Sequence, residues 1–326
     1  MNDLVSVIIP VFNGEKYICE SIRSCVEQTY PNIEIIIIND GSTDNSKNVI
    51  LEYIKEYKNI KFLDLPHKGK VNAINKGVEI SKGIFIAIQA ADDICYSDRI
   101  YNEVNLMKKN KNNVLIFGDM TVVDEKLNII SKSFIKLNKL NKLNFNNSFE
   151  GLLYGNFVSG GTMLINSIIK GKIFPIPSNL LYEDWWIAFV SSYYGNICMI
   201  DKPLIMYRQH SSNDNGYYYI KGYRKRFMKI KNNYKRNLPY YEEFKKFIIK
   251  NVSQREIMKK YIDILNNNIL VNKLLFSSNI IKRISLVLKN KVKNRKIRVI
   301  VYMLLGEKWL YYKYYFRYLK NETRMI

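Results

Sequence analysis

The sequence predicts an α/β fold in which a mostly parallel central sheet is flanked by helices and followed by a basic α-helical region. Apolar, strand-like runs alternate with helix-spaced segments over the first hundred residues, and the composition changes after Gly216. Repeated strand–helix–strand units indicate parallel strands joined by right-handed crossovers. The chain has 326 residues, 47% of them hydrophobic, which is enough for one domain over residues 1–215 and a second region over residues 216–326.

The predicted elements of the first hundred residues follow one another closely. Residues 5–11, VSVIIPV, are almost continuously apolar, which is typical of a strand covered on both faces. Residues 15–28 place apolar side chains at helical spacing, and residues 33–40, IEIIIIND, predict a second buried strand. Residues 42–44 then offer N-cap side chains for the next helix. The remaining predicted elements are a strand over 60–65, a helix over 70–81 and a strand over 83–89.

Polar side chains follow the first two predicted strands. The carboxyl ends of parallel strands meet at one edge of a sheet, where open α/β sheets bind ligands. The second strand ends in Asn-Asp-Gly-Ser-Thr-Asp, and a carboxylate beside a tight glycine turn can accept hydrogen bonds from a base or a ribose hydroxyl. Asp40 and Asp44 are equally suited to capping the following helix, so both interpretations stay open at this point.

Two acidic pairs offer carboxylates for metal binding or catalysis. Asp92 and Asp93 end an apolar run, and adjacent carboxylates in a poorly solvated site repel unless a cation such as Mg²⁺ or Mn²⁺ compensates them. Glu183 and Asp184 precede two tryptophans, and burial beside aromatic rings raises a carboxyl pKa toward the range of a general base. The alternatives are a solvated turn for the first pair and an ordinary helix N-terminus for the second.

Other patterns exclude several classes of protein. No GxGxxG follows the first strand and no GxxxxGK[ST] occurs, so the usual dinucleotide and P-loop phosphate cradles are absent from the sequence. The four cysteines form no CxxC pair and only two histidines are present, so free, cytosolic thiols are expected and a zinc cluster is not. The sequence shows no run of about 18 apolar residues and no signal-peptide pattern at its start.

Three longer segments carry a family resemblance. Residues 5–46 read VSVIIPVFNGEKYICESIRSCVEQTYPNIEIIIINDGSTDNS, and residues 67–99 read HKGKVNAINKGVEISKGIFIAIQAADDICYSDR. Residues 182–214 read YEDWWIAFVSSYYGNICMIDKPLIMYRQHSSND. In this order the segments resemble family 2 glycosyltransferases of bacterial surface-polysaccharide type, the inverting group with the GT-A fold. The resemblance covers roughly residues 4–215 and implies a nucleotide-diphosphosugar-binding domain.

The resemblance also implies roles for the two acidic pairs. Asp92 would contact ribose or phosphate, and Asp93, with Asp92, would ligate Mg²⁺ or Mn²⁺. Asp184 would be the catalytic base that deprotonates the acceptor hydroxyl as this oxygen attacks the anomeric carbon. A single displacement of this kind needs no protein nucleophile, so the anomeric centre would be inverted.

The resemblance further implies donor contacts at the strand ends. Pro10, Val11 and Phe12 would line the nucleotide base, and Asp40 would hydrogen-bond it. The other implied nucleotide-sugar contacts are Asn13, Glu15, Gly41 and Glu183.

Two positions depart from the family pattern, and a histidine near the end of the resemblance has two interpretations. Ala90-Ala91 precede the acidic pair where many members carry a polar first residue. Ile74 stands where many members carry arginine, so Lys68 or Lys70 is expected to contact phosphate or sugar instead. His210 lies where members close the donor site and is interpreted as a diphosphate or metal contact, with a structural histidine as the alternative.

The net charge of +22 lies entirely in the last third of the chain. Residues 1–215 carry 23 basic and 23 acidic side chains, whereas residues 216–326 carry 28 and 6. Residues 282–320 interleave these cations with apolar and aromatic side chains, and Lys313, Arg317 and Lys320 would share one helical face. This pattern favours the headgroup layer of an anionic membrane over nucleic acid, which is not expected as a partner. A helical bundle with a solvated basic face is the third possibility.

These observations combine into one functional hypothesis. The protein would transfer a hexose from UDP-hexose or dTDP-rhamnose to a glycan acceptor, lipid-linked, in O-antigen or capsule synthesis. It would act at the cytoplasmic face of the cell membrane as a peripheral protein. A nucleotidylyltransferase or sugar-nucleotide-binding relic is the competing interpretation, and the non-enzymatic alternative is a membrane or nucleic-acid adaptor built on the same domain.

Overall fold

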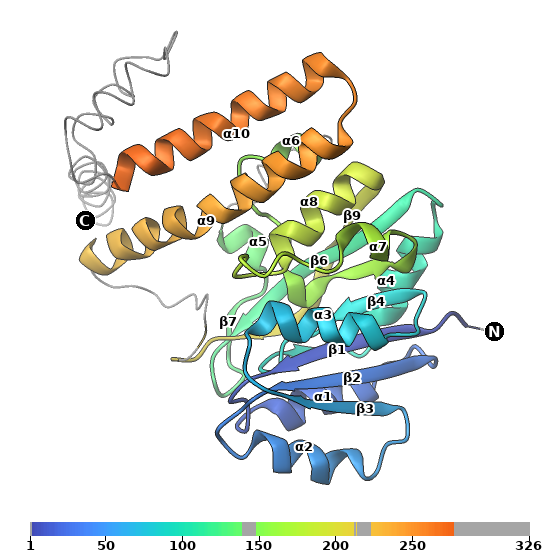
Figure 1. The fold of residues 1–326 in the computed structure, drawn as a ribbon. Coiled ribbons are helices and arrows are strands. Elements are labelled where there is room, and N and C mark those ends of the chain that lie inside the picture. Colours follow the sequence, from blue (N-terminus) through green and yellow to red (C-terminus); the bar gives the residue numbers. More distant parts are fainter. Residues whose placement is uncertain (1, 139–147, 212, 214–222, 277–326) are drawn as a thin grey trace. The chain divides into compact units, whose positions relative to one another are not determined.

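A computed structural model describes residues 2–138, 148–211, 213 and 223–276 (Figure 1). The chain divides into two compact units, residues 1–216 and residues 217–326. The first unit contains the sheet and all the candidate site residues, and the second contributes two long helices to the described part of the chain.

One sheet of nine strands forms the centre of the first unit, within the described residues. Its order is β3-β2-β1-β4-β8-β6-β9-β5, with β7 paired to β6. The first four strands run parallel, as predicted: β1 (Val5–Val11), β2 (Ile33–Asp40), β3 (Ile60–Leu65) and β4 (Phe85–Ile88). The others are β5 (Ile94–Cys95), β6 (Asn113–Val123), β7 (Ile129–Ser131), β8 (Leu164–Asn166) and β9 (Asn196–Arg208).

The second half of the sheet is mixed. β8 lies antiparallel between β4 and β6, whereas β6 and β9 run parallel to each other. The mostly parallel sheet with flanking helices is confirmed, and the insertion of β8 brings the chain around residue 160 back beside the end of β4.

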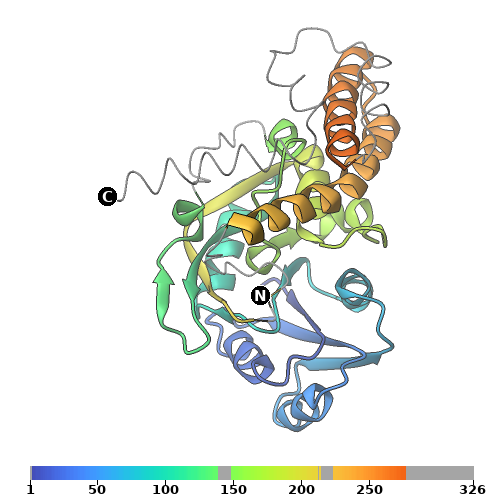
Figure 2. The same cartoon turned by 90° about the vertical axis from the view of Figure 1, so that its left-hand side faces the viewer.

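Helices cover both faces of the sheet. Val5, Val7 and Ile9 face a core that is shared with α1 (Ile18–Val26), α2 (Ser46–Ile54) and α4 (Arg99–Lys108). The opposite face is covered by α3 (Lys70–Ile80), where a Cβ at Gly77 would lie 2.5 Å from Ile8. Figures 1 and 2 show α1 and α3 on opposite sides of the β1–β2–β3 part of the sheet.

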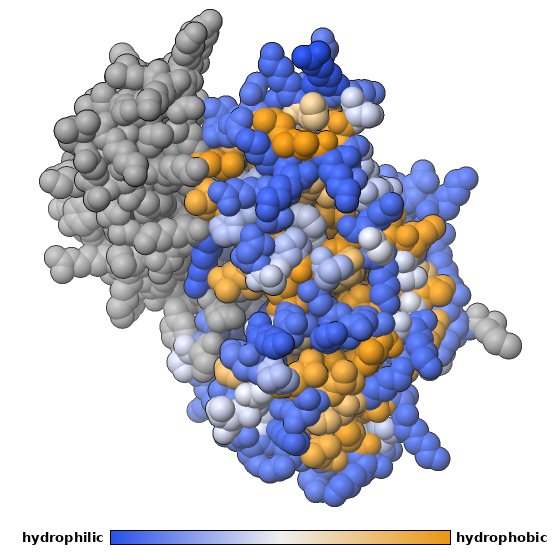
Figure 3. Space-filling model, in the orientation of Figure 1, coloured by the Kyte–Doolittle hydropathy of each residue, from blue (hydrophilic) through white to orange (hydrophobic). Residues whose placement is uncertain are grey.

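The remaining helical segments follow β7 in the chain. They are α5 (Phe134–Leu137), α6 (Ser148–Leu152), η3 (Gly160–Thr162), η4 (Ser167–Ile169), α7 (Lys170–Ile173) and α8 (Asp184–Tyr194). Figure 3 shows hydrophobic side chains reaching the surface around α3 and the edge strand β3, whose residues are mostly half-buried.

The first two helices start later than the sequence predicted. The predicted helix over residues 15–28 begins at Ile18, and the one expected after residues 42–44 begins at Ser46. The backbone N–H groups of Asn13 and Gly14 instead donate to the hydroxyls of Ser42 (2.9 Å) and Ser46 (2.8 Å). Glu15, the first residue of the predicted helix, likewise donates its backbone N–H to Asp44 Oδ2 at 3.1 Å, so the chain up to Glu15 is held by the residues after β2 and α1 begins at Ile18.

In the second unit, α9 (Tyr223–Asn251) and α10 (Arg255–Phe276) pack against each other. Lys245 Nζ on α9 donates to Asn266 Oδ1 on α10 at 2.8 Å. Among the described residues, none of the helices combines the length and the apolar character needed to cross a bilayer. The predicted basic helix over residues 282–320 lies outside the described residues.

Candidate functional site

The loops after β1 and β2 are tied to each other by side chains. Asn13 adopts a left-handed backbone conformation (φ 50°), and its Oδ1 accepts from Thr43 N at 2.8 Å. Glu15 Oε2 accepts from Asn45 N at 2.8 Å. The expected donor contacts Asn13 and Glu15 therefore lie at the predicted edge of the sheet, where they connect the two loops.

An exposed pair of stacked rings lies at the end of β1. Pro10 and Val11 are buried within the strand, whereas the Phe12 side chain is 47% exposed. The His67 ring stacks on Phe12 with 4.1 Å between ring centroids. His67 was not singled out from the sequence, although it follows the third strand just as the other candidates follow theirs. The pair presents a flat aromatic surface at the edge of the sheet.

Asp40 is buried and organises the loop that leads into α3. Its two carboxylate oxygens accept from Lys68 N and Gly69 N, each at 2.9 Å, and Oδ2 lies 2.9 Å from His67 Nδ1. Gly41 (φ 67°) permits this approach, because a Cβ there would lie 2.6 Å from His67 N. Asp40 therefore does not cap α2, and its carboxylate already accepts two backbone N–H groups.

The two carboxylates of the first acidic pair have different surroundings. Asp93 is 3% exposed, and its Oδ1 accepts from Arg208 N at 2.9 Å. The Asp92 side chain is 31% exposed, and its Oδ2 lies 2.9 Å from His210 Nε2. Burial and the adjacent Asp92 charge raise the pKa of Asp93 well above its usual value. Asp92 is thus the carboxylate that faces solvent, next to the histidine that the sequence pointed to.

A buried arginine that sequence reasoning missed holds this region together. Arg208 ends β9, and its guanidinium lies 4.6 Å above the centre of the Tyr17 ring. It donates to the Asp92 carbonyl (3.0 Å) and the Glu125 carbonyl (3.1 Å), and it forms an ion pair with Glu20. The only sequence signal was its place in the segment Tyr-Arg-Gln-His, one position away from Gln209 and two from His210.

The second acidic pair lies at the start of α8. Glu183 is 2% exposed, and its Oε1 lies 2.9 Å from Lys70 Nζ, while Oε2 has no hydrogen-bond partner among the described residues. Burial raises the pKa of Asp184 to about 7, helped by the Glu183 charge and opposed by Lys70. Partial burial opposes the charged form of Lys70, but the Glu183 carboxylate outweighs it and raises the lysine pKa.

Lys70 and Lys68 differ in what they contact. Both lysines are exposed, but Lys70, the first residue of α3, reaches the second acidic pair with its Nζ, whereas Lys68 contacts Asp40 through its backbone N–H. Ile74, one turn further along α3, is fully buried and cannot contact a ligand. Of the two lysines expected to replace the missing arginine, the structure brings Lys70 to the acidic residues.

The two acidic pairs are separated by a glycine turn. A Cβ at Gly160 would overlap Glu183 Oε1, and one at Gly161 would lie 3.7 Å from Asp93 Oδ2. The turn Gly160–Thr162 therefore runs between the pairs at the carboxyl edge of the sheet. No group of three His, Cys, Asp or Glu residues in the described part of the chain is close enough to hold a metal ion by itself. Any cation here would need ligand or water oxygens as well.

Comparison with known proteins identifies a family. The chain matches the model of glycosyl transferase family 2 over residues 6–169. It is 35% identical over 198 residues to an uncharacterized glycosyltransferase of Rickettsia typhi, with 59% of this chain and 60% of that protein covered. It is 32% identical over 225 residues to an uncharacterized glycosyltransferase of Haemophilus influenzae, covering 66% and 68%. The chain thus spans about 60% of the length of the Rickettsia relative.

Solved structures show the same fold at low sequence identity. TarS 1–349 of S. aureus in complex with UDP-GlcNAc aligns with a TM-score of 0.58 at 18% identity, over 93% of this chain and 79% of that one. The mannosyltransferase PcManGT of Pyrobaculum calidifontis, in complex with GDP-Man and Mn²⁺, aligns with a TM-score of 0.56 at 12% identity, over 96% and 87%. Because the family match covers half of the chain and the sheet has the arrangement of these GT-A structures, the protein belongs to glycosyl transferase family 2.

Proposed function

We propose that the protein is an inverting, metal-dependent glycosyltransferase that moves a hexose from a nucleotide diphosphate sugar to a glycan acceptor. The observation that carries the proposal is the arrangement of two acidic pairs on either side of the Gly160–Gly161 turn, with Lys70 paired to one of them. One pair offers a carboxylate with a pKa near neutrality, and the other offers an accessible carboxylate beside a histidine.

Asp184 is the proposed general base. A base works best when its pKa lies near the operating pH, and burial raises the pKa of Asp184 to about 7. Its Oδ1 accepts from the Trp185 backbone N–H at 2.7 Å, which orients the carboxylate that would take the proton of the acceptor hydroxyl. A single base supports direct displacement at the anomeric carbon, and this displacement inverts its configuration.

The metal contact is reassigned within the first acidic pair. The sequence pointed to Asp93 together with Asp92. Because the Asp93 side chain is buried and accepts from Arg208 N, we propose Asp92 together with His210 as the metal contact. A carboxylate and an imidazole are suitable ligands for Mn²⁺, and a carboxylate suits Mg²⁺, which keeps several water ligands. A bound cation would supply positive charge to the leaving diphosphate. The complex of PcManGT with Mn²⁺ supports metal use in this fold.

The nucleotide is proposed to lie along the ends of β1 and β2. The exposed stack of Phe12 and His67 offers a surface for the base, and Lys70 supplies a cation beside the second acidic pair. A UDP-hexose or dTDP-rhamnose donor is proposed, and the complexes of TarS with UDP-GlcNAc and UDP support the nucleotide diphosphate class.

The acceptor is proposed to be a lipid-linked glycan of O-antigen or capsule type at the inner face of the cell membrane. The support is the charge distribution, since the excess of 22 positive charges lies in residues 216–326. Each lysine or arginine near an anionic surface contributes about 1 kcal/mol to binding.

The decisive experiment is a binding screen followed by a transfer assay. UDP-, dTDP- and GDP-sugars are tested with and without Mn²⁺ for an increase in melting temperature, because a ligand that binds only the folded state stabilises it. The best donor is then used to compare Asp184→Asn with Asp201→Asn, a control in the exposed part of β9. Donor-dependent stabilisation with transfer lost only in Asp184→Asn supports the proposal. Failure of every nucleotide sugar to stabilise the protein contradicts it and favours the adaptor alternative.

A further inference from the structure

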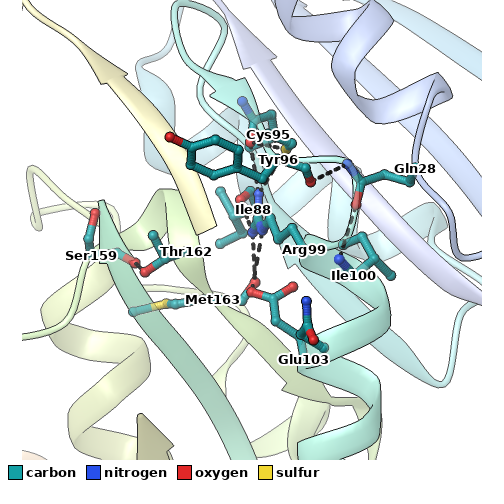
Figure 4. A network of polar contacts seen from close by, with 12 residues as sticks. Gln28, Ile88, Cys95, Tyr96, Arg99, Ile100, Glu103, Ser159, Thr162 and Met163 are labelled. Carbon is teal, nitrogen blue, oxygen red and sulfur yellow. Dashed lines mark hydrogen bonds and ion pairs between the residues drawn. The ribbon is translucent and has the colours of Figure 1, made fainter. Parts of the chain in front are cut away.

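A fully buried ion pair lies close to the first acidic pair in the fold. Arg99 is the first residue of α4, and Glu103 follows one turn later. Both side chains are completely buried, and Arg99 Nε lies 3.3 Å from Glu103 Oε1 (Figure 4). Burying a guanidinium is destabilising unless its charge and its N–H groups are satisfied.

The guanidinium reaches two other segments of the chain, at residues 88–89 and at Met163. One terminal nitrogen donates to Gln89 Oε1 at 2.8 Å, directly after β4. The other donates to the Ile88 carbonyl at 3.1 Å and to the Met163 carbonyl at 3.4 Å. A planar group with several donors can connect segments in this way, whereas a lysine ammonium acts as a point charge.

Gln89 carries the connection on to the acidic pair. Its side chain is fully buried, and Nε2 donates to the Asp93 carbonyl at 2.9 Å and to the Ala90 carbonyl at 3.1 Å. The side-chain amide of Gln89 therefore closes the turn that carries Asp92 and Asp93. The oxygen of the same amide accepts a hydrogen bond from Arg99.

The second arm of Arg99 supports the other acidic pair. Met163 directly follows the Gly160–Thr162 turn, which lies against Glu183 on one side and Asp93 on the other. The Arg99 guanidinium thus contacts the carbonyl of Ile88, which precedes the Asp92–Asp93 turn, and the carbonyl of Met163, which follows the Gly160–Thr162 turn. It touches none of the four carboxylates of the two acidic pairs.

The network is poorly suited to a purely stabilising role. Glu103 Oε2 has no hydrogen-bond partner among the described residues, and an unsatisfied buried oxygen is destabilising. Burial raises the pKa of Glu103 to about 7 in spite of Arg99. Buried ion pairs can often be replaced by apolar residues without loss of stability. The role of this pair is therefore better inferred from the groups that it contacts than from a contribution to stability.

We propose that Arg99 and Gln89 are positioning residues, which hold the Asp92–Asp93 turn and the Gly160–Thr162 turn in register so that the two acidic pairs face one ligand. The proposal rests on the proposed function only for the identity of that ligand. The structural statement, that Gln89 fixes the backbone of residues 90–93, stands on its own contacts.

The test compares Gln89→Met with Gln28→Met, a control from the same region. Gln28 is also buried, donates to two carbonyls (Ser24 and Tyr96, both 2.9 Å) and accepts from Ile100 N at 3.0 Å. Both substitutions remove two hydrogen bonds to backbone carbonyls. Gln89 also accepts from Arg99 and from Cys95 Sγ, and of the two glutamines only Gln89 contacts the acidic turn. Amide hydrogen exchange in residues 90–95 is measured by mass spectrometry, and Mn²⁺ binding in the presence of UDP is measured by electron paramagnetic resonance.

Gln89→Met is expected to speed exchange in residues 90–95 and to weaken Mn²⁺ binding about 10–100-fold, the range for losing a group that supports a metal ligand. Gln28→Met, with a similar drop in melting temperature, is expected to leave both unchanged. The proposal is overturned if Gln89→Met and Gln28→Met show the same hydrogen exchange in residues 90–95 and the same Mn²⁺ affinity. If the wild-type protein binds no Mn²⁺ with UDP or GDP, the proposed function fails, while hydrogen exchange still decides the positioning role.

A second variant covers the case in which Gln89→Met does not fold. Arg99→Lys keeps a charge beside Glu103 but cannot reach Gln89, Ile88 and Met163 together. It is expected to fold and to show the same faster exchange and weaker Mn²⁺ binding. Wild-type exchange and binding in Arg99→Lys overturn the role assigned to the guanidinium.

Discussion

Lys70 Nζ lies 2.9 Å from Glu183 Oε1, which joins the first residue of α3 to the residue that precedes α8. The two helices are more than a hundred residues apart in the sequence, and their N-termini meet at the carboxyl edge of the sheet. Asp184 lies next to this ion pair, and the positive charge of Lys70 partly offsets the rise in its pKa.

The first prediction concerns Lys70→Met. Without the lysine charge, the pKa of Asp184 rises above its present value of about 7, so the general base is deprotonated only at higher pH. The acid limb of the pH–rate profile is expected to move to higher pH. The matched control is Lys76→Met on the same helix, because Lys76 pairs with Glu79 at the surface. An acid limb that stays in place would show that Lys70 does not influence the base.

The second prediction concerns Asp184→Asn. Transfer is expected to fall roughly 10²–10⁴-fold with donor binding retained, because asparagine keeps the shape but accepts no proton.

The same carboxyl group also makes the stability of the folded protein depend on pH. In the folded protein Asp184 stays protonated up to about pH 7, whereas in the unfolded chain it loses its proton near pH 3.8. The free energy of unfolding of the wild-type protein therefore falls as the pH rises between these two values. The stability advantage of Asp184→Asn, measured by urea unfolding, should therefore grow from pH 5 to pH 8.

The third prediction separates the two carboxylates of the first acidic pair. Asp92→Asn is expected to weaken Mn²⁺ binding strongly, because Asp92 is the accessible carboxylate beside His210. Asp93→Asn keeps an oxygen that can accept from Arg208 N, so it should fold normally and retain more of the Mn²⁺ affinity. Titration of each variant with Mn²⁺ distinguishes the two. If Asp93→Asn weakened Mn²⁺ binding more than Asp92→Asn, Asp93 would be the metal ligand.

The fourth prediction concerns the glycine turn. Gly160→Ala is expected to destabilise the protein by about 1–3 kcal/mol, because its methyl group would collide with the buried Glu183 carboxylate. The displaced carboxylate would also leave Lys70, so activity should fall with stability. Gly171→Ala in α7 is the control, since nothing lies within 4 Å of a Cβ there. Equal unfolding free energies for the two variants would contradict this packing.

The fifth prediction concerns the excess of positive charge in residues 216–326. The full-length protein is expected to float with anionic vesicles, more weakly at 0.5 M than at 0.1 M salt, because the screening length is only about 10 Å at 0.1 M. Vesicles of neutral lipid are the control. Equal binding to both kinds of vesicle would argue against electrostatic attraction, and tight binding to RNA alone would favour the nucleic-acid alternative.

β1, β2 and β4 could be predicted from the sequence because they are covered on both faces. Continuous apolar runs such as Ile35–Ile38 have no other stable location. The first helix was predicted three residues early, since the local pattern does not reveal that Asn13 and Gly14 donate to Ser42 and Ser46.

The site was predicted in part, for a similar physical reason. Residues at the boundaries of elements, such as Asp92 after β4 and Asp184 at the start of α8, are visible as polar breaks in apolar patterns. Which carboxylate of a pair is buried depends on partners distant in the sequence, and Asp93 meets Arg208 more than a hundred residues later. His67 and Arg208 stand in mixed surroundings where a single polar residue carries no signal of its own.

The hydrogen bonds between the loops after β1 and β2 have a consequence for how fast a ligand can associate. Asn13, Gly14 and Glu15 donate their backbone N–H groups to side chains of the neighbouring loop. The two loops therefore lose their conformational freedom when the chain folds, before any ligand arrives. Because a pre-organised surface loses little entropy on binding, association at this edge should be limited by diffusion and charge, without a slow rearrangement of the loops.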